Sequence, residues 1–302
     1  MRFEGRGAVI TGGGRGIGAV VARELAEHGA KVVVSARSMS EIEAVAQELT
    51  AGGHIAYAIK CDVADEDSVA MMAREAAELL ETVDVLVNNA GIARSSPVKR
   101  LSLEEWSQIM AVNATGTFLC SKAFLPGMLQ RQWGRVVNVA SVAGLRGSSY
   151  IAAYTASKHA QIGFTRALAA EVADQGITVN AICPGYVDTP MTEYSVAHIV
   201  EKTGVSSEEA LGHILALSKQ NRLIRPEETA ATIAFLASPE AGAIRGVSLA
   251  VDGVAFTRAR LGVGRPKRQV GTAACRLLLL GCVFTQLGSL CLSDNGAYYM
   301  MG

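Results

Sequence analysis

Tyr154 and Lys158 form a pair whose residue types and spacing could move a proton. They stand in SSYIAAYTASKHA (148–160), a segment that reads as a helix. Residues four apart share one helical face, so the Lys158 ammonium can reach the Tyr154 phenol. A free phenol has a pKa of about 10, and a cation about 4 Å away at an effective dielectric near 20 favours the phenolate by roughly 4 kcal/mol, or about three pKa units before desolvation is subtracted. The pair predicts a proton-transferring tyrosine, whereas an isolated pair would more often be a core-edge tyrosine and a solvated lysine.

Seven short apolar runs rich in β-branched residues must position this pair. They are separated by segments with helical periodicity, such as 18–29 and 41–53. Runs that are apolar on both faces are typical of parallel strands covered by helices on both sides. The pattern predicts an α/β fold, a single-domain Rossmann-like doubly wound parallel sheet of about seven strands with helices on both faces. The runs are 7–11, 31–36, 54–60, 83–89, 134–141, 177–183 and 246–252.

Two parts of the chain differ in composition. Residues 1–257 contain no linker and are predicted as one domain, whereas 258–302 carry six basic residues followed by an apolar run at 277–292. That run is shorter than the roughly 20 residues that a membrane helix needs. Attachment to a membrane surface, packing against a partner subunit and an adventitious extension are three interpretations of 258–302, and we favour the last. Such an extension could also impair activity.

The overall composition excludes several classes of function. The chain is 50% hydrophobic and 19% charged, which is typical of a globular protein. Its 28 basic and 28 acidic residues leave no net charge to attract nucleic acid or an anionic membrane, so a small-molecule partner is expected. The six cysteines show no zinc-site spacing, which predicts reduced, mostly buried thiols and no metal. The N-terminal segment lacks the zones of a signal peptide, which predicts a cytoplasmic protein.

A glycine-rich segment, TGGGRGIG (11–18), follows the first predicted strand and leads directly into a helix. Glycines at such a turn let backbone N–H groups approach a pyrophosphate at the positive end of the helix. Because strand, loop and helix occur in the required order, we predict a dinucleotide site rather than a glycine-rich turn without a ligand. The residues assigned to the site are Gly12, Gly14, Arg15, Gly16, Ile17 and Gly18.

The end of the second predicted strand indicates which dinucleotide binds. An acid that accepts from the ribose 2′-hydroxyl is expected there, but the sequence VVVSARS places Ser35 and Arg37 at this point. Arg37 and Arg15, with no evident opposing carboxylate, can instead pair with a 2′-phosphate. This predicts NADP(H) ahead of NAD(H), unless both arginines are solvated surface charges. Asp62 and Val63 are assigned to the adenine end, and a cap of the next helix is an equal interpretation of Asp62.

Six features occur in a fixed order along residues 3–256. They are TGGGRGIG (11–18), NNAG (88–91), Asn113, Ser141, YTASK (154–158) and PG (184–185). In this order they resemble the short-chain dehydrogenase/reductases of the classical type, in particular the 3-oxoacyl-thioester and carbonyl reductases. Each motif alone is weak, but the ordered set is specific.

The resemblance implies a catalytic role for Asn113, Ser141, Tyr154 and Lys158. Tyr154 would be the general acid in ketone reduction and the base in alcohol oxidation. Lys158 would lower the pKa of Tyr154 and bind the nicotinamide ribose, Ser141 would hold the substrate oxygen, and Asn113 would support a water-linked proton path. The cofactor would supply the hydride, and the protein would supply alignment and charge.

The resemblance also implies cofactor contacts after the fourth and sixth strands, where the residues alone predict only turns. Asn88 would stabilise the centre of the sheet. The residues that would contact the cofactor, besides Tyr154 and Lys158, are Asn89, Ala90, Gly91, Pro184, Gly185, Val187 and Thr189.

Two helical stretches are expected between Tyr186 and about Arg222. They would cover the cleft as a lid, or they would close a small core of their own, and both interpretations stay open. An apolar lid suits a 3-oxoacyl thioester, a polyketide-like compound or another medium-sized ketone, with sugars and steroids also open. Long helices are expected at 104–130 and 152–173, and the resemblance implies that they pair in a homodimer or homotetramer.

These observations predict an NADP(H)-dependent oxidoreductase that moves hydride between nicotinamide and a ketone or secondary alcohol. The alternative is a nucleotide-binding regulatory or tail-attached scaffold protein with little turnover, against which the four filled catalytic positions argue. A serine hydrolase is excluded, since Ser141 lies in VASVAG rather than in a GxSxG elbow and none of the histidines is in an evident triad setting.

Overall fold

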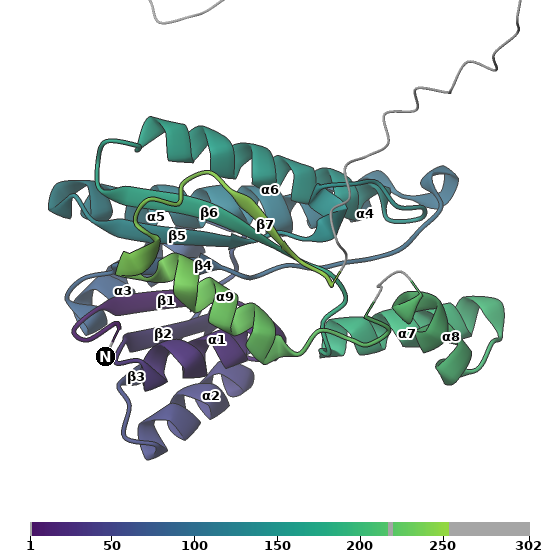
Figure 1. The fold of residues 1–302 in the computed structure, drawn as a ribbon, viewed down its shortest axis with the longest axis horizontal. Coiled ribbons are helices and arrows are strands. Elements are labelled where there is room, and N and C mark those ends of the chain that lie inside the picture. Colours follow the sequence, from purple (N-terminus) through teal and green to yellow (C-terminus); the bar gives the residue numbers. More distant parts are fainter. Residues whose placement is uncertain (1, 217–219, 254–302) are drawn as a thin grey trace, which may run out of the picture. The chain divides into compact units, whose positions relative to one another are not determined.

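The computed structural model describes residues 2–216 and 220–253, which lie in one compact unit, Met1–Ala255. The predicted extension 258–302 lies outside the described residues. Figure 1 shows the described unit as one sheet with helices packed on both of its faces.

Seven parallel strands form the sheet in the order β3-β2-β1-β4-β5-β6-β7. The valines of β2, Val32, Val33 and Val34, are fully buried, so both faces of this strand depend on covering helices. The predicted doubly wound parallel sheet is confirmed. The strands are β1 (Gly7–Thr11), β2 (Lys31–Ala36), β3 (Ala56–Lys60), β4 (Val85–Asn88), β5 (Gly134–Val139), β6 (Ile177–Pro184) and β7 (Ser248–Val251).

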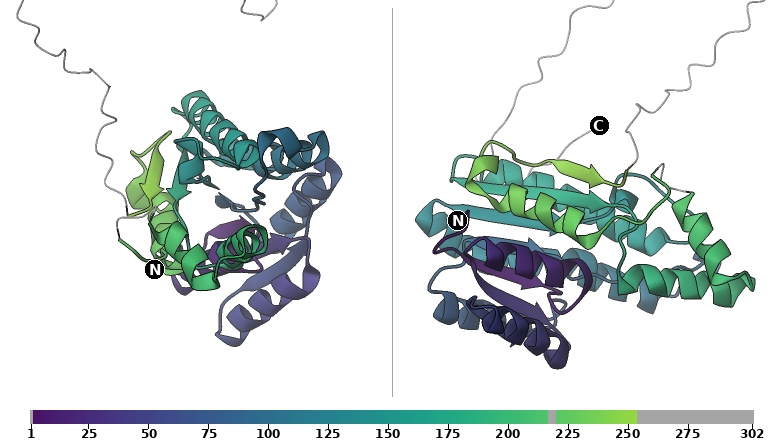
Figure 2. Two further views of the ribbon diagram at one scale, coloured as in Figure 1. Left: turned by 90° about the vertical axis from the view of Figure 1, so that its right-hand side faces the viewer. Right: turned by 60° about the horizontal axis from the view of Figure 1, so that its bottom comes forward.

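Two groups of helices cover the sheet, and each closes a separate apolar core. One core takes Leu25, Ile42 and Ile233 from α1 (Gly16–Glu27), α2 (Met39–Ala51) and α9 (Pro226–Ala237). The other core takes its apolar side chains from α3 (Glu66–Leu80), α5 (Gly116–Arg131) and α6 (Ala152–Glu171). Helices α1 and α9 lie side by side in the views of Figures 1 and 2.

A long helical segment crosses the site region between β4 and β5. It consists of α4 (Leu103–Met110), a π-helical turn (Ala111–Thr115) and α5. Ser102 starts it with a capping box that includes Glu105. The helices predicted at 104–130 and 152–173 are confirmed, but the sequence did not predict the π-helical turn, a feature often found at functional sites.

Two further helices, α7 (Pro190–Thr203) and α8 (Ser207–Leu215), follow β6 as predicted. Figures 1 and 2 show them beyond the end of the sheet. Ala210 and Ile214 of α8 are buried, whereas Met191 and Tyr194 of α7 are exposed. Both interpretations of this segment therefore have support, since it closes a small core and also presents apolar side chains to solvent.

Within residues 2–216 and 220–253, no helix is long and apolar enough to cross a membrane. The three cysteines of this part of the chain, Cys61, Cys120 and Cys183, are free and buried, as predicted for reduced thiols. The cytoplasmic location stays a prediction.

Candidate active site

The carboxyl ends of the strands gather the four catalytic candidates. Ser141 follows β5, Asn113 lies in the π-helical turn, and Tyr154 and Lys158 lie in the first half of α6. The carboxyl ends of parallel strands meet at one edge of a sheet, which is where ligands bind in doubly wound folds. The fold therefore brings together residues that are up to 45 positions apart in sequence, counted from Asn113 to Lys158.

Asn113 is fully buried, and its amide connects three elements. Its Oδ1 accepts from the N–H of Ile92 at 2.8 Å, and its Nδ2 donates to the Ile92 carbonyl at 2.9 Å and to Ser157 Oγ at 3.0 Å. Ser157 Oγ in turn donates to the Tyr154 carbonyl at 2.7 Å. Asn113 thus fixes the loop after β4 against the helix that carries Tyr154, while its part in a proton path stays a prediction.

Tyr154 lies half-buried beside Ser141. Burial raises the pKa of Tyr154 to about 12, and a hydrogen bond with the Ser141 side chain acts in the opposite direction. Ser141 Oγ also accepts from the N–H of Ala143 at 3.1 Å, which orients the hydroxyl at the start of a short 3₁₀ turn. A phenol with a raised pKa is protonated at neutral pH and can donate its proton to a substrate oxygen.

Lys158 is buried and binds neutral oxygens. Its Nζ donates to the Val139 carbonyl at 2.8 Å and to Gln161 Oε1 at 2.9 Å, and it lies 5.7 Å from the centroid of the Tyr154 ring. Burial lowers the pKa of Lys158 to about 7. Burial disfavours the charged form of both side chains, so the pKa of Tyr154 is raised here, and a lowering of it by charged Lys158 stays a prediction.

Gln161 is a polar residue of the site that the sequence analysis missed. It is 1% exposed, and its Nε2 donates to Thr117 Oγ1 at 2.8 Å while its Oε1 faces Lys158. The signal that could have found it is its spacing, because a residue three positions after Lys158 shares its helical face. A glutamine on that inward face had to find polar partners.

The glycine loop between β1 and α1 keeps space for a ligand. Gly12 has a φ of 65°, a conformation that favours glycine. A Cβ at Gly18 would lie 2.2 Å from the Gly12 carbonyl oxygen, so only glycine lets the helix approach the loop this closely. Helix α1 begins at Gly16 without a side-chain cap, which leaves its positive end available to an anion. The Ser35 hydroxyl is buried, and the residue touches the loop through its carbonyl, which accepts from Gly13 at 3.1 Å.

Asn89 and Ala90 hold this loop in shape. Asn89 Nδ2 donates to the carbonyls of Thr11 and Gly12, each at 3.0 Å. Thr11 Oγ1 accepts from the N–H groups of Asn89 and Ala90, each at 3.1 Å. The segment after β4 is therefore in direct contact with the glycine loop.

Asn88 stabilises the centre of the sheet, as the resemblance implies. It is buried, and its Nδ2 donates to Asn138 Oδ1 of the neighbouring strand at 2.8 Å and to Ser121 Oγ at 3.1 Å. These bonds connect β4 to β5 and to α5, so Asn88 has a structural position rather than a cofactor-facing one.

The two arginines assigned to a 2′-phosphate both face a carboxylate. Arg15 Nη1 lies 3.2 Å from Glu41 Oε1, and Arg37 Nη1 lies 4.0 Å from Asp62 Oδ2. The expectation of an arginine pair with no opposing carboxylate is therefore wrong, because α2 and the loop after β3 bring these acids across from them. Both arginine side chains are exposed, and exposed ion pairs are weak, so an incoming phosphate can compete for the guanidinium groups.

Asp62 and Val63 lie in the loop after β3. Asp62 Oδ1 accepts from the N–H of Ala64 at 3.0 Å, whereas Asp65 provides the cap of α3. The alternative role of Asp62 as a helix cap is therefore wrong. Val63 is buried, and its side chain packs so closely on Gly116 of α5 that a Cβ there would lie 2.8 Å away.

The turn between β6 and α7 closes the site on its other side. Pro184 ends β6, and the Gly185 N–H donates to the last residue of β7 at 2.9 Å. Val187 is buried, and its carbonyl accepts from Thr189 Oγ1 at 3.2 Å. Thr189 reaches the glycine loop, since a Cβ at Gly16 would lie 3.3 Å from its Cγ2.

These residues fit a dinucleotide. Glycines form a cradle that side chains would fill, because a Cβ at Gly91 would lie 3.3 Å from Asn113 Oδ1 and 3.7 Å from Lys158 Nζ. The same cradle includes Gly16 beside Thr189. Gly91 beside the catalytic candidates and Gly16 beside Thr189 put the chemistry end and the nucleotide end at the same carboxyl edge of the sheet.

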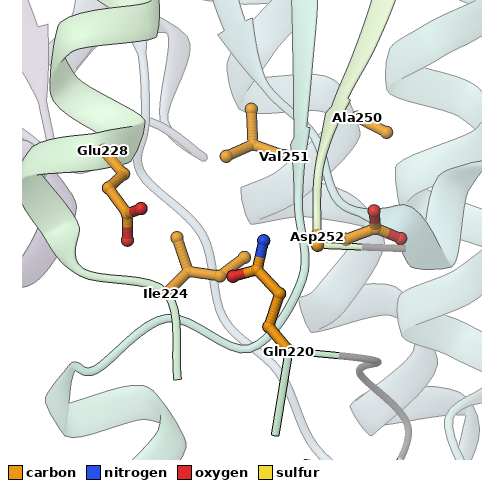
Figure 3. A pocket seen from close by; sticks show the side chains of 7 residues that line it. Gln220, Ile224, Glu228, Ala250, Val251 and Asp252 are labelled. Atoms are coloured by element: carbon orange, nitrogen blue, oxygen red, sulfur yellow. The ribbon is translucent and has the colours of Figure 1, made fainter. Parts of the chain in front are cut away.

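A separate open cavity of about 310 Å³ lies at the end of β7. Figure 3 shows the side chains of Gln220, Ile224 and Val251 around it. None of the four catalytic candidates lines it, but its lining residue Val251 accepts from the Gly185 N–H, so it adjoins the turn after β6. The cavity is lined by Gln220, Ile224, Glu228, Ala250, Val251, Asp252 and Gly253.

Comparison with known proteins decides the family. The family model described as short chain dehydrogenase matches residues 6–199. The chain belongs to this family. It is similar to the 3-oxoacyl-[acyl-carrier-protein] reductase FabG of Vibrio cholerae, with 40% identity over 253 residues that cover 84% of this chain and 98% of the relative. It is also similar to the D-beta-hydroxybutyrate dehydrogenase of Cupriavidus necator, with 37% identity over 83% of this chain and 98% of the relative.

Solved structures of short-chain dehydrogenases agree with this assignment. An actinorhodin polyketide ketoreductase variant with NADPH has a TM-score of 0.80 and 39% identity over 82% of this chain and 96% of that chain. Levodione reductase has a TM-score of 0.80 and 33% identity over 83% of this chain and 98% of that chain. The prediction of an oxidoreductase is confirmed, and the scaffold alternative is not supported.

Proposed function

We propose that this short-chain dehydrogenase is an NADP(H)-dependent carbonyl reductase whose reaction is carried by Tyr154, Ser141, Lys158 and Asn113. The observation that carries the proposal is the position of a protonated phenol, a hydroxyl and a buried amine at the carboxyl edge of the sheet, beside a glycine cradle. A ketone bound there accepts hydride from the cofactor and a proton from the protein.

The protein's own residues supply the proton and orient the oxygen. Ser141 Oγ, already oriented by Ala143, donates to the substrate carbonyl oxygen, and Tyr154 gives its proton to the same oxygen as the alcohol forms. The raised pKa of Tyr154 keeps the acid form present at neutral pH, which suits reduction better than alcohol oxidation. A charged Lys158 in this low-dielectric site favours the phenolate that remains.

The nucleotide is held by residues of several elements. The uncapped start of α1 and the turn at Thr189 receive the pyrophosphate, and Asp62 lies at the adenine end. Arg15 and Arg37 bind the 2′-phosphate in place of Glu41 and Asp62, which accounts for a preference for NADP(H). The relative solved with NADPH supports this choice.

The substrate class that best suits the site is a 3-oxoacyl thioester or a related medium-sized ketone. Tyr186 lies close enough to influence Tyr154, and it is 40% exposed. Met191 and Tyr194, on the helix that follows the same turn, expose further apolar surface to an acyl chain. The names of the curated relatives, which include two 3-oxoacyl-[acyl-carrier-protein] reductases, support this class.

A homodimer or homotetramer is supported by apolar surface on the second group of helices. Phe118 of α5 is 44% exposed and makes an edge-to-face contact with Phe164 of α6, with ring centroids 6.1 Å apart. Such a patch on two long helices is typical of a surface that pairs with another copy. Light scattering of the full chain tests this point.

The function is tested by following NADPH absorbance with a panel of 3-oxoacyl thioesters, cyclic ketones, sugars and steroids. We expect the highest kcat/KM with thioesters, a lower rate with NADH, and a loss of about 10²- to 10⁴-fold in kcat for Tyr154→Phe with NADPH binding retained. Tyr150→Phe is the matched control, since Tyr150 is exposed outside the cluster. Full turnover by Tyr154→Phe, or no turnover of any ketone by the wild type, would refute the proposal.

A further inference from the structure

Gln161 occupies a position between the catalytic lysine and the core of the protein. It lies on the inward face of α6, one turn after Lys158, and is 1% exposed. Its amide touches one group on each side, the Lys158 ammonium at 2.9 Å and Thr117 Oγ1 of α5 at 2.8 Å. A buried polar side chain with two short bonds is costly to misplace.

The chemistry of the two neighbours fixes which end of the amide faces which partner. The ammonium has only N–H donors, so the Gln161 group that meets it must be the oxygen. The Thr117 hydroxyl donates its one hydrogen to the Asn113 carbonyl at 2.9 Å, so it accepts from the Gln161 NH₂. A flipped Gln161 amide would lose both bonds, so these two neighbours allow only one orientation of the side chain.

These bonds belong to a chain of contacts that joins three of the catalytic candidates. Lys158 is bonded to Gln161, Gln161 to Thr117, and Thr117 to the Asn113 carbonyl. The Asn113 side chain continues to Ser157, which donates to the Tyr154 carbonyl. This chain of hydrogen bonds starts and ends on α6, at Lys158 and Tyr154. A displacement of the Lys158 amine is therefore resisted by bonds to both α5 and α6.

The same group of buried side chains is anchored in the sheet. The Gln161 carbonyl accepts from Thr165 Oγ1 at 2.8 Å, and Thr165 Oγ1 accepts from Asn138 Nδ2 of β5 at 2.8 Å. The Val139 carbonyl, which is the other acceptor of Lys158, belongs to the same strand. Strand β5 thus positions one of the two oxygens that face the ammonium directly, the Val139 carbonyl, and it anchors the backbone of Gln161 through Thr165.

We propose that Gln161 is a positioning residue that holds the Lys158 ammonium in the site and stabilises its positive charge through the amide oxygen. The role rests on the proposed carbonyl reductase function, in which Lys158 acts as a cation. Val139 and Gln161 take two of the three N–H donors of the ammonium, which leaves one N–H for the cofactor or for the phenol.

The surroundings of Lys158 make this neutral oxygen important. The ionisable groups beside it are Tyr154 of its own helix, with its ring centroid 5.7 Å away, and Cys183 of β6, whereas the two hydrogen-bond acceptors of the ammonium, Val139 and Gln161, are neutral. Burial lowers the pKa of Lys158 to about 7, so the fraction that is charged at neutral pH is sensitive to each acceptor. Removing one oxygen lowers this fraction, and replacing it with a carboxylate raises it.

The experiment is a titration of Lys158 in the full chain labelled with ¹³Cε-lysine, with Lys158→Met used to assign the signal. We expect a wild-type midpoint near pH 7. In Gln161→Met the midpoint falls by about one unit, and in Gln161→Glu it rises by about one unit or more, because the first loses an acceptor and the second gains an opposite charge. A merely structural role would not move the two variants in opposite directions.

Ser121→Ala is the matched control. Ser121 Oγ is buried in the same region and donates to the Thr117 carbonyl, but it does not contact Lys158. We expect this variant to lose stability while its Lys158 midpoint stays at the wild-type value. Unchanged midpoints in both Gln161 variants, or the same shift in all three, would overturn the proposal. If one Gln161 variant fails to fold, the other decides alone by the same criterion.

The titration separates this role from the proposed function, because it needs neither cofactor nor substrate. A protein that reduces no carbonyl compound but shows the opposite shifts refutes the function and retains the positioning role. If the function holds, kcat of Gln161→Met falls more at pH 8 than at pH 6, because lower pH restores the ammonium, and Gln161→Glu does not show this recovery.

Discussion

Two buried cations lie at opposite edges of the same sheet, Lys158 at the carboxyl edge and Arg135 at the amino edge. Both are almost fully buried, and both are held by carbonyl oxygens. They differ in whether the cation can be deprotonated, since an ammonium can lose its proton at accessible pH and a guanidinium cannot. The comparison teaches that the same means of burying a charge serves chemistry in one place and stability in the other.

Arg135 belongs to a cluster of side chains that contributes to the stability of the fold and not to the reaction. Its Nη1 donates to the Gly134 carbonyl at 2.8 Å, and its guanidinium lies 4.4 Å from the centroid of Trp133, whose ring also receives Arg6 at 3.8 Å. Asp84 accepts from the Gly7 N–H and pairs with Arg6. Burial lowers the pKa of Arg135, yet its guanidinium stays charged.

The largest expected effect is the loss of the titrating cation. Lys158→Met removes the charge that favours the Tyr154 phenolate, so we expect kcat for ketone reduction to fall by about 10²- to 10⁴-fold. Steady-state NADPH oxidation measures it. Lys122→Met, which removes an exposed lysine of α5, is the control and should leave kcat unchanged. Equal activity of the two variants would mean that the carboxyl-edge cation has no part in the reaction.

The next effect concerns stability alone. Arg135→Lys keeps the charge but loses the planar fork that reaches the Ser238, Gly134 and Gly176 carbonyls, so we expect a loss of about 1–3 kcal/mol in the free energy of unfolding. Urea denaturation measures this loss, and kcat per folded molecule should stay at the wild-type value. If Arg135→Lys kept full stability but had a reduced kcat, Arg135 would serve the reaction and not the stability of the protein, which would contradict the comparison.

The smallest effect is expected at the ring between the two arginines. Trp133→Leu removes the cation–π contacts with Arg6 and Arg135, and we expect the free energy of unfolding to fall by about 1 kcal/mol. Trp106→Leu, at the more exposed tryptophan of α4, serves as the reference and should change stability by less than about 0.5 kcal/mol. If urea denaturation shows a larger loss of stability for Trp106→Leu than for Trp133→Leu, the cluster around Trp133 is not a source of stability.

The sequence predicted the sheet because its strands are continuous β-branched runs, and it predicted the ordered motifs because their residue types are specific. It also placed both long helices. The π-helical turn at Asn113 was not predicted, and neither were the bonds of Asn113 to Ile92 and Ser157 in other segments. No local signal indicates such long-range partners.

The partners and pKa values of the charged side chains were the part of the site that the sequence predicted least well. Spacing placed Lys158 on the face of Tyr154, but the rotamer that puts the ammonium on Val139 and Gln161 follows from packing. Glu41 and Asp62 opposite Arg15 and Arg37 come from separate elements, so no pattern along the chain joined them. The pKa values depend on burial, which one-dimensional spacing does not contain.

The most direct test of the central claim is the pH dependence of kcat/KM for NADPH between pH 6 and 10, with a saturating ketone. This quantity reports ionisations of the free enzyme. The pKa of Lys158 is lowered to about 7, so its active, charged form is present below that pH and is lost above it, while Tyr154, with a pKa raised to about 12, stays protonated throughout. We predict that kcat/KM decreases about tenfold per pH unit above pH 7. A profile that is flat or rises from pH 7 to pH 9 would contradict the account.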